Sequence, residues 1–335
     1  MSIQYKSIAE LKTMLNNNEI SNAELIKETF SLVKSNAEIN AFITLNDEES
    51  INKANKLDDC PSSGSLAGIP IAQKDLFCTK DLKTTCGSNM LSNFIPPYSA
   101  TVVKNLENAG CISIGKTNMD EFAMGSSNET SFYGKVQNPW GKNLVPGGSS
   151  GGAAAAVAAG IVPAASGTDT GGSIRQPASL CGVTGIKPTY GRISRWGMIA
   201  FASSLDQAGP IARTAEDCAT LLNEMCSHDE KDTTSLNEDI PDFTENLNSP
   251  INGLKIGIVK EFDLSKLDNE VVKVFEESKK HYESLGAEFI EISLPNISLS
   301  VPTYYVVAPA ECSSNLSRFD GVKFGKRCES PKNLE

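Results

Sequence analysis

Histidine is scarce in this sequence, which has only His228 and His281 among its 335 residues. His228 stands in an acidic segment and His281 in a segment rich in lysine and glutamate, so both are expected to be solvated surface residues. A hydrolase whose serine is activated by histidine needs that base, and an acid, placed after the serine. The shortage of histidine therefore argues against a Ser-His-Asp enzyme.

Paired cysteine motifs are also missing, although the sequence contains nine cysteines. The cysteines are scattered, odd in number and never spaced as CxxC. The first residues show no basic region followed by an apolar run, so no secretory signal is expected. These features predict free thiols in a reducing cytoplasm, and they exclude a disulfide framework or a zinc framework. We therefore expect a cytoplasmic protein without a metal site.

Long apolar runs and an excess of positive charge are absent as well. The longest apolar run, residues 153–162, is far shorter than the roughly 18 residues of a membrane span. Lysine and arginine number 30 against 41 acidic residues, a net charge of −11. Because phosphate contacts need clustered lysine and arginine, we expect no broad nucleic-acid-binding face on this chain and no membrane contact. If RNA is involved, a partner is expected to hold it.

Glycine and serine are concentrated in residues 147–175, where two Gly-Ser clusters flank an alanine run. The first cluster, 147–152, opens a helix-like run, and the second, 171–173, opens another toward Leu180. Glycine lets backbone approach a ligand closely, and the start of a helix presents free N–H groups that suit an oxyanion. Flexible linkers are not usually interleaved with an apolar strand and an alanine helix. The stretch therefore predicts two serines held near backbone donors.

Two familiar patterns match the sequence but fail on context. Residues 110–117, GCISIGKT, fit the phosphate-loop pattern, which requires a glycine-rich loop between a strand and a helix. Here the middle residues themselves are typical of a strand, so residues 115–117 are interpreted as its end. Residues 147–151 fit the GxSxG pattern of the α/β-hydrolases, whose mechanism needs a histidine base, and both histidines of this sequence are expected to lie at the surface.

A serine assisted by a lysine is the remaining possibility for nucleophilic chemistry. Lysine acts as a base only when it is neutral, and burial lowers the lysine pKa because the ammonium loses its hydration. Lys74 follows an apolar, strand-like run at residues 66–72, where a buried lysine could lie. From spacing alone, a solvated surface lysine remains the alternative.

The Gly-Ser clusters together carry a family resemblance. GGSSGG at 147–152, DTGGSIR at 169–175 and a lysine about 75 residues before the first serine resemble the amidase signature family. The resemblance is dense from Leu66 to about Thr214. It implies an α/β fold, the amidase signature fold, with a large mixed twisted β-sheet covered by helices on both faces.

The resemblance also implies a set of site residues. Ser173 would be the nucleophile that forms the acyl-enzyme, Ser149 a bridging serine whose peptide bond is expected to be cis, and Lys74 the base. Backbone N–H groups would form the oxyanion hole. The implied donors are those of Thr170, Gly171, Gly172 and Ser173.

Flanking segments point to one branch of this family. Residues 115–127, 138–140 and 302–321 resemble the glutaminase subunits of bacterial tRNA-dependent amidotransferases, which are ligases of protein biosynthesis. This implies hydrolysis of glutamine to glutamate and ammonia, with the ammonia passed to a partner, the B subunit. That partner would hold the tRNA and convert Glu-tRNA(Gln) to Gln-tRNA(Gln) with ATP and Mg²⁺, and a small C subunit would clamp the heterotrimer. No cofactor is expected on this chain. The implied substrate-binding residues are Met124, Gly125, Ser126 and Tyr304.

The organisation of the chain is expected to be one amidase domain over residues 1–335. Its expected parts are N-terminal helices within 1–60, a signature core at 66–215, an exposed acidic excursion at 227–252 and a truncated C-terminal part at 253–335. Members of the branch continue beyond residue 335 with an arginine and an aspartate that read the two ends of glutamine. This chain is therefore expected to keep the triad without a complete specificity pocket. A stand-alone amidase and an inactive scaffold stay open as alternatives.

Local sequence patterns predict several helices and strands. Capping boxes at 7–10 and 21–24 predict two N-terminal helices. Residues 118–124 are expected to begin a helix and residues 193–202 to contribute strands. Strands alternating with helices predict an α/β layer fold around a mixed sheet.

Overall fold

The computed structural model describes residues 3–60, 63–330 and 332–333. Contacts within the chain define two compact units. The larger contains residues 1–244 and 308–335, and the smaller contains residues 245–307. Both predicted serines and the predicted lysine lie in the larger unit.

Two capped helices begin the larger unit, as the capping boxes predicted. They are α1 (Ile8–Asn16) and α2 (Asn22–Ser35), and they are followed by α3 (Asp47–Asp59). In each of the first two helices the N-cap serine hydroxyl accepts the N–H of the glutamate three residues on, whose carboxylate accepts the serine N–H. These bonds satisfy N–H groups that a helix start leaves free. Ile26 and Phe30 of α2 then pack into the main core.

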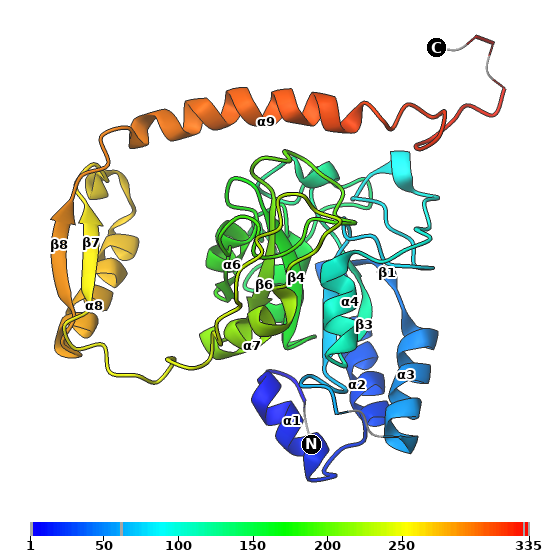
Figure 1. The fold of residues 1–335 in the computed structure, drawn as a ribbon, viewed down its shortest axis with the longest axis horizontal. Coiled ribbons are helices and arrows are strands. Elements are labelled where there is room, and N and C mark those ends of the chain that lie inside the picture. The colour runs from blue at the N-terminus through cyan, green and yellow to red at the C-terminus, as the bar shows by residue number, and fades with distance from the viewer. Residues whose placement is uncertain (1–2, 61–62, 331, 334–335) are drawn as a thin grey trace. The chain divides into compact units, whose positions relative to one another are not determined.

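A mixed sheet lies at the centre of the larger unit (Figure 1). Among the described residues it has six strands, in the order β1-β3-β2-β4-β6-β5. The strands are β1 (Phe42–Leu45), β2 (Pro70–Lys74), β3 (Ile112–Thr117), β4 (Ala164–Asp169), β5 (Thr184–Gly185) and β6 (Gln207–Ala212). β2 runs parallel to both of its neighbours, whereas β1, β5 and β6 pair antiparallel. The predicted α/β fold with a mixed sheet is confirmed.

Helices cover the sheet on both faces. α5 (Gly151–Ala158) packs in one core cluster with Ala165 of β4 and Ile211 of β6. Because side chains alternate along a strand, Ala164 and Ala212 point to the opposite face. There α7 (Ala215–Met225) packs on β6 and against α4 (Thr101–Asn108).

The small residues of α5 are required by its surroundings. A Cβ at Gly152 would lie 2.4 Å from the carbonyl oxygen of Asn118 and 2.6 Å from that of Ala41. These atoms belong to backbone, which cannot move aside as a flexible side chain can. The Gly-Ala run therefore brings the helix, and the serines before it, tight against the sheet.

Two segments differ from the sequence-based expectation. Residues 118–124 contain only a short 3₁₀ turn, η3 (Glu121–Ala123), because the Asp120 carboxylate accepts the backbone N–H of Asn128 and folds the chain into a loop. Residues 193–202 form no named strand in the described structure. Asp206 accepts the N–H groups of Phe201 and Ala202 there, which removes these donors from strand pairing.

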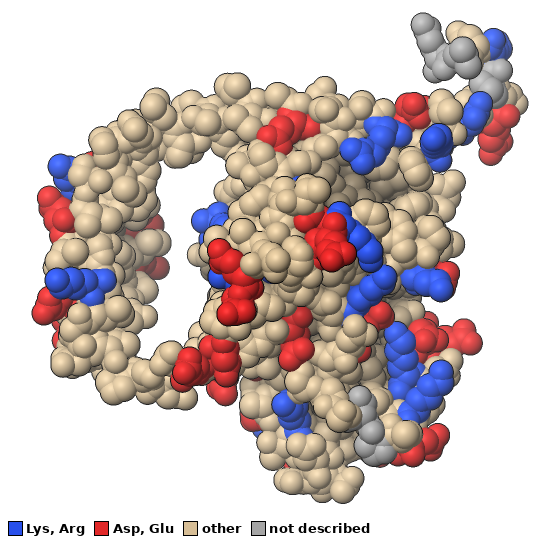
Figure 2. All heavy atoms as spheres, in the orientation of Figure 1, with Lys and Arg blue, Asp and Glu red and all other residues tan. Residues whose placement is uncertain are grey.

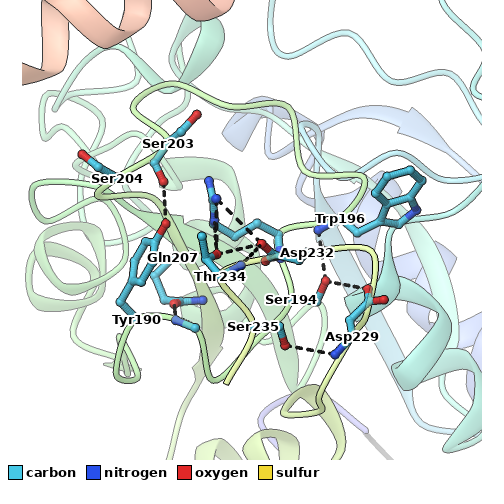
Figure 3. A network of polar contacts seen from close by, with 12 residues as sticks. Tyr190, Ser194, Trp196, Ser203, Ser204, Gln207, Asp229, Asp232, Thr234 and Ser235 are labelled. Carbon is cyan, nitrogen blue, oxygen red and sulfur yellow. Dashed lines mark hydrogen bonds and ion pairs between the residues drawn. The ribbon is translucent and has the colours of Figure 1, made fainter. Parts of the chain in front are cut away.

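The acidic segment also differs from the expected excursion. Residues 237–252 are mostly exposed, but Asp229 and Asp232 accept hydrogen bonds from residues 194–195. Asp229 accepts the Ser194 hydroxyl at 2.7 Å, and Asp232, which is buried, accepts the Arg195 N–H at 2.8 Å (Figure 3). Composition alone predicted solvated charges, because it carries no information on the partners that tertiary folding supplies.

The smaller unit contains β7 (Lys255–Val259), α8 (Asn269–Ser284) and β8 (Glu288–Ile292). The two strands pair in parallel, and the helix α8 connects them in the chain. The helix α9 (Ser300–Leu316) begins in this unit and ends in the larger one, and it was not expected from the sequence.

The surface carries both signs of charge. On the face drawn in Figure 2, lysine and arginine side chains are interspersed with aspartate and glutamate. Across the part of the chain that the structure describes, no helix combines the length and the apolar character needed to cross a bilayer.

Candidate active site

Lys74 is the last residue of β2, a strand buried along its whole length in the middle of the sheet. Its Nζ lies 2.8 Å from the Ser149 hydroxyl oxygen and 2.8 Å from that of Thr168. Burial lowers the pKa of Lys74 to about 7, and the charges of Asp120, Asp169 and two further groups oppose this shift only in part. A lysine in this state can accept a proton near neutral pH.

Ser149 follows a cis peptide bond, Gly148–Ser149, as the resemblance implied. The serine is buried, and the glycine before it has no room for a side chain. A Cβ at Gly148 would lie 2.0 Å from Asp120 Oδ2. The Gly148 N–H donates to Gln176 Oε1 at 3.0 Å, so bonds on both sides fix this turn. The carbonyl of Ser149 accepts the Asp120 N–H at 3.3 Å.

Ser173 lies in the turn between β4 and α6 (Arg175–Cys181), and it is 8% exposed. Asp169, at the end of β4, accepts the backbone N–H groups of Gly172 and Ile174 and pairs with the Arg175 guanidinium at 2.9 Å. Burial by itself would raise the pKa of Asp169, but its bonds to Arg175 and to the Ile174 N–H lower this pKa overall. An ionised Asp169 thus holds the turn that presents Ser173. The Ser173 carbonyl accepts the Ser150 N–H at 3.2 Å, which ties the two serine loops together.

The predicted oxyanion donors occupy this same turn. The Gly172 N–H already donates to Asp169 Oδ1 at 2.9 Å, so in this structure it is not free to bind an oxyanion. Thr170 is held by its hydroxyl, which donates to Asp206 Oδ1 at 2.5 Å. The N–H groups of Thr170, Gly171 and Ser173 remain as candidate donors. Helix α6 begins only at Arg175, so these donors belong to the turn before the helix and not to its first residues.

The predicted substrate-binding residues divide between the two units. Met124, Gly125 and Ser126 are exposed and follow η3 in the larger unit, where Met124 Sδ lies 3.1 Å from Cys312 Sγ. Tyr304 belongs to α9 within the smaller unit, and its ring centroid lies 5.6 Å from that of its neighbour Tyr305. Substrate binding by these four residues stays a prediction.

Rival groups for the chemistry are unsuitable. Cys181 is buried, and burial raises the pKa of its thiol to about 12. His228 and His281 are exposed, as expected. Groups of three or more histidine, cysteine or acidic side chains suited to holding a metal do not occur among the described residues.

A second buried lysine, Lys116, belongs to the pattern that mimics a phosphate loop. Residues 112–117 form β3, which confirms the strand interpretation and excludes the loop. Lys116 Nζ donates to the Thr79 and Thr84 hydroxyls at 3.1 and 3.0 Å and to the Phe77 carbonyl. Its hydrogen bonds are therefore made within the protein, and it does not serve as a phosphate-binding lysine.

Three residues of the site escaped the sequence reasoning. Thr168 contacts Lys74, Asp206 holds Thr170, and Asp120 lies beneath Gly148. For Thr168 the sequence did offer a sign: a polar residue in a strand of small residues can mark a site. For the two aspartates the sequence offered no comparable sign.

The model of the amidase family matches residues 24–335. The A subunit of glutamyl-tRNA(Gln) amidotransferase from Coxiella burnetii is 58% identical over 334 residues, covering 98% of this chain and 69% of the relative.

Solved structures of related proteins match the fold of this chain. The crystal structure of the A subunit of glutamyl-tRNA(Gln) amidotransferase from Thermotoga maritima matches with a TM-score of 0.87 and 42% identity, covering 94% of this chain and 67% of that one. A native peptide amidase from Stenotrophomonas maltophilia matches with a TM-score of 0.87 and 29% identity, with the same coverage. This chain belongs to the amidase family.

Proposed function

We propose that this chain is the glutaminase subunit of a tRNA-dependent amidotransferase, in the class of the glutamine-hydrolysing glutaminyl-tRNA synthases. The observation that carries the chemistry is the buried hydrogen bond between Lys74 and Ser149 in a member of the amidase family. The choice of branch rests on 58% identity to the relative from Coxiella burnetii along nearly the whole chain.

Acyl transfer on Ser173 is the proposed reaction. Neutral Lys74 takes the proton of the Ser149 hydroxyl, and Ser149 takes that of Ser173, whose oxygen attacks the carboxamide carbon of glutamine. The N–H groups of Thr170, Gly171 and Ser173 stabilise the oxyanion. The tetrahedral intermediate then collapses. Lys74 returns the proton through Ser149 to the leaving nitrogen, which departs as ammonia. Water then attacks the ester, releasing glutamate and restoring the serine.

Partner subunits supply the rest of the proposed reaction. Ammonia passes to the B subunit, which holds Glu-tRNA(Gln) and uses ATP and Mg²⁺ to amidate it, while the C subunit clamps the complex. No cofactor is assigned to this chain, and a cytoplasmic location is proposed. The net charge of −11 supports assigning the main RNA contacts to the partner.

A stand-alone amidase is the second candidate, favoured by the structural match to a peptide amidase. Ammonia release separates the two. The proposal expects release from glutamine that rises when both partner subunits and glutamylated tRNA are added, and that Ser173→Ala abolishes. Hydrolysis of simple amides at full rate without any partner would favour the alternative. If the chain binds its partner subunits but releases no ammonia, the result would favour the inactive scaffold.

A further inference from the structure

Asp120 is a buried acid that the proposed reaction does not yet use. Its Oδ2 accepts the Asn128 N–H at 3.0 Å, and its Oδ1 accepts the Thr130 hydroxyl at 2.9 Å. Among the ion pairs of the described residues none includes Asp120. A buried carboxylate is costly without hydrogen bonds, and these bonds stabilise it while leaving its charge unneutralised.

Two segments of the site meet at this carboxylate. On one side, a Cβ at Gly125 would lie 2.4 Å from Asp120 Cγ, so the segment that carries the predicted substrate-binding residues closes directly over it. On the other side, a Cβ at Gly148 would lie 2.0 Å from Oδ2, and the Asp120 N–H donates to the Ser149 carbonyl. Asp120 thus lies between the segment at 124–130 and the peptide that places Ser149.

The charge of Asp120 also reaches Lys74. The groups whose charges raise the pKa of Lys74 are Asp120, Asp169, Asp206 and Cys86, in that order. Asp169 is paired with Arg175, which offsets its effect at longer range. Burial raises the pKa of both Asp206 and Cys86, which disfavours their charged forms. Asp120 is therefore the leading unpaired charge that acts on the lysine.

We propose that Asp120 is a positioning residue for acyl transfer, which fixes the segment 124–130 against the Gly148–Ser149 peptide. This inference rests on the proposed function. A small error in the placement of Ser149 costs a large factor in rate, since proton transfer depends on geometry. The carboxylate favours protonated Lys74, so its removal lowers the pH at which the lysine becomes neutral.

The test uses covalent labelling by a fluorophosphonate probe, which reports activated serine without requiring glutamine. Wild-type protein, in complex with its partner subunits, should be labelled at Ser173, and Ser173→Ala should not be. With Asp120→Asn we expect labelling to slow roughly ten- to a hundredfold and the midpoint of its pH profile to move to lower pH. The matched control is Asp217→Asn, a buried acid on α7, which should leave rate and midpoint unchanged.

Two further variants separate the effects of placement and charge. Thr130→Val removes one bond to the carboxylate and Gly125→Ala displaces it, and both keep the charge. Each should slow labelling without moving the midpoint. A folded Asp120→Asn with the wild-type rate and midpoint would overturn the inference. If Asp120→Asn does not fold, wild-type labelling rates in both Thr130→Val and Gly125→Ala would overturn the inference. Absence of labelling at Ser173 in the wild type would instead refute the proposed function itself.

Discussion

Lys74 Nζ lies 2.8 Å from Ser149 Oγ, although the two residues are 75 positions apart and both are buried. One residue ends a central strand, and the other stands just before the alanine helix. Lys74 is in direct hydrogen-bond contact with the Ser149 hydroxyl, so a proton that leaves Ser149 is expected to go to the lysine.

Ser173→Ala should abolish formation of the acyl-enzyme, because the other hydroxyl of the turn, that of Thr170, is engaged in a hydrogen bond to Asp206. Mass spectrometry of the trapped intermediate measures this. The rival thiol of Cys181 is buried and its pKa is raised to about 12. Cys181→Ala is therefore the control and should keep the adduct. A covalent adduct found on Cys181 would refute the assignment.

Lys74→Ala and Ser149→Ala should each reduce turnover by orders of magnitude and leave the fold intact. Groups that act as one relay are strongly non-additive, so the double variant should lose little more than either single variant. Ammonia release under identical conditions gives the three rates, and circular dichroism reports on the fold. Losses that multiply would mean that the two residues act independently.

The pH dependence of glutamine hydrolysis should follow the neutral fraction of Lys74. Burial lowers its pKa to about 7, and only the unprotonated amine accepts a proton. The rate should therefore rise with pH and reach half of its plateau near pH 7. A profile of kcat/KM against pH measures this limb in the free enzyme. A profile that stays flat from pH 5.5 to about 8.5, roughly 1.5 units on either side of that midpoint, would rule out Lys74 as the base.

Lys74→Met should change how stability depends on pH. The folded-state pKa is about 7 and the ordinary value is 10.5, so between these values the unfolded wild type binds the extra proton. Its free energy of unfolding should rise with pH there, by at most about 1.4 kcal/mol per pH unit. The methionine variant lacks this slope, so its stability relative to wild type should be highest at or below pH 7 and decline toward pH 10.

Urea denaturation at several pH values measures the difference. Lys280→Met, which replaces an exposed lysine on α8, is the control and should keep the wild-type slope. Parallel curves for wild type and Lys74→Met would contradict a depressed lysine pKa.

Sequence patterns anticipated the features that depend on neighbouring residues. The serine–glutamate boxes fixed the starts of α1 and α2, because a cap needs only residues three positions apart. The middle of residues 110–117 was correctly interpreted as a strand from its apolar residues. Local reasoning failed for residues 118–124, where the carboxylate of Asp120 bonds to an N–H eight residues on and prevents a helix.

The roles of Lys74 and the serines came from resemblance to the amidase family, since spacing alone left a surface lysine possible. By itself the sequence determined the residue types of the site and the small side chains that let its loops pack tightly. Tertiary structure decided which groups meet: Thr168 against Lys74, Asp206 against Thr170, and Asp120 beneath Gly148. The physical reason is that burial and hydrogen bonding between distant segments set both the pKa of Lys74 and the availability of each N–H group.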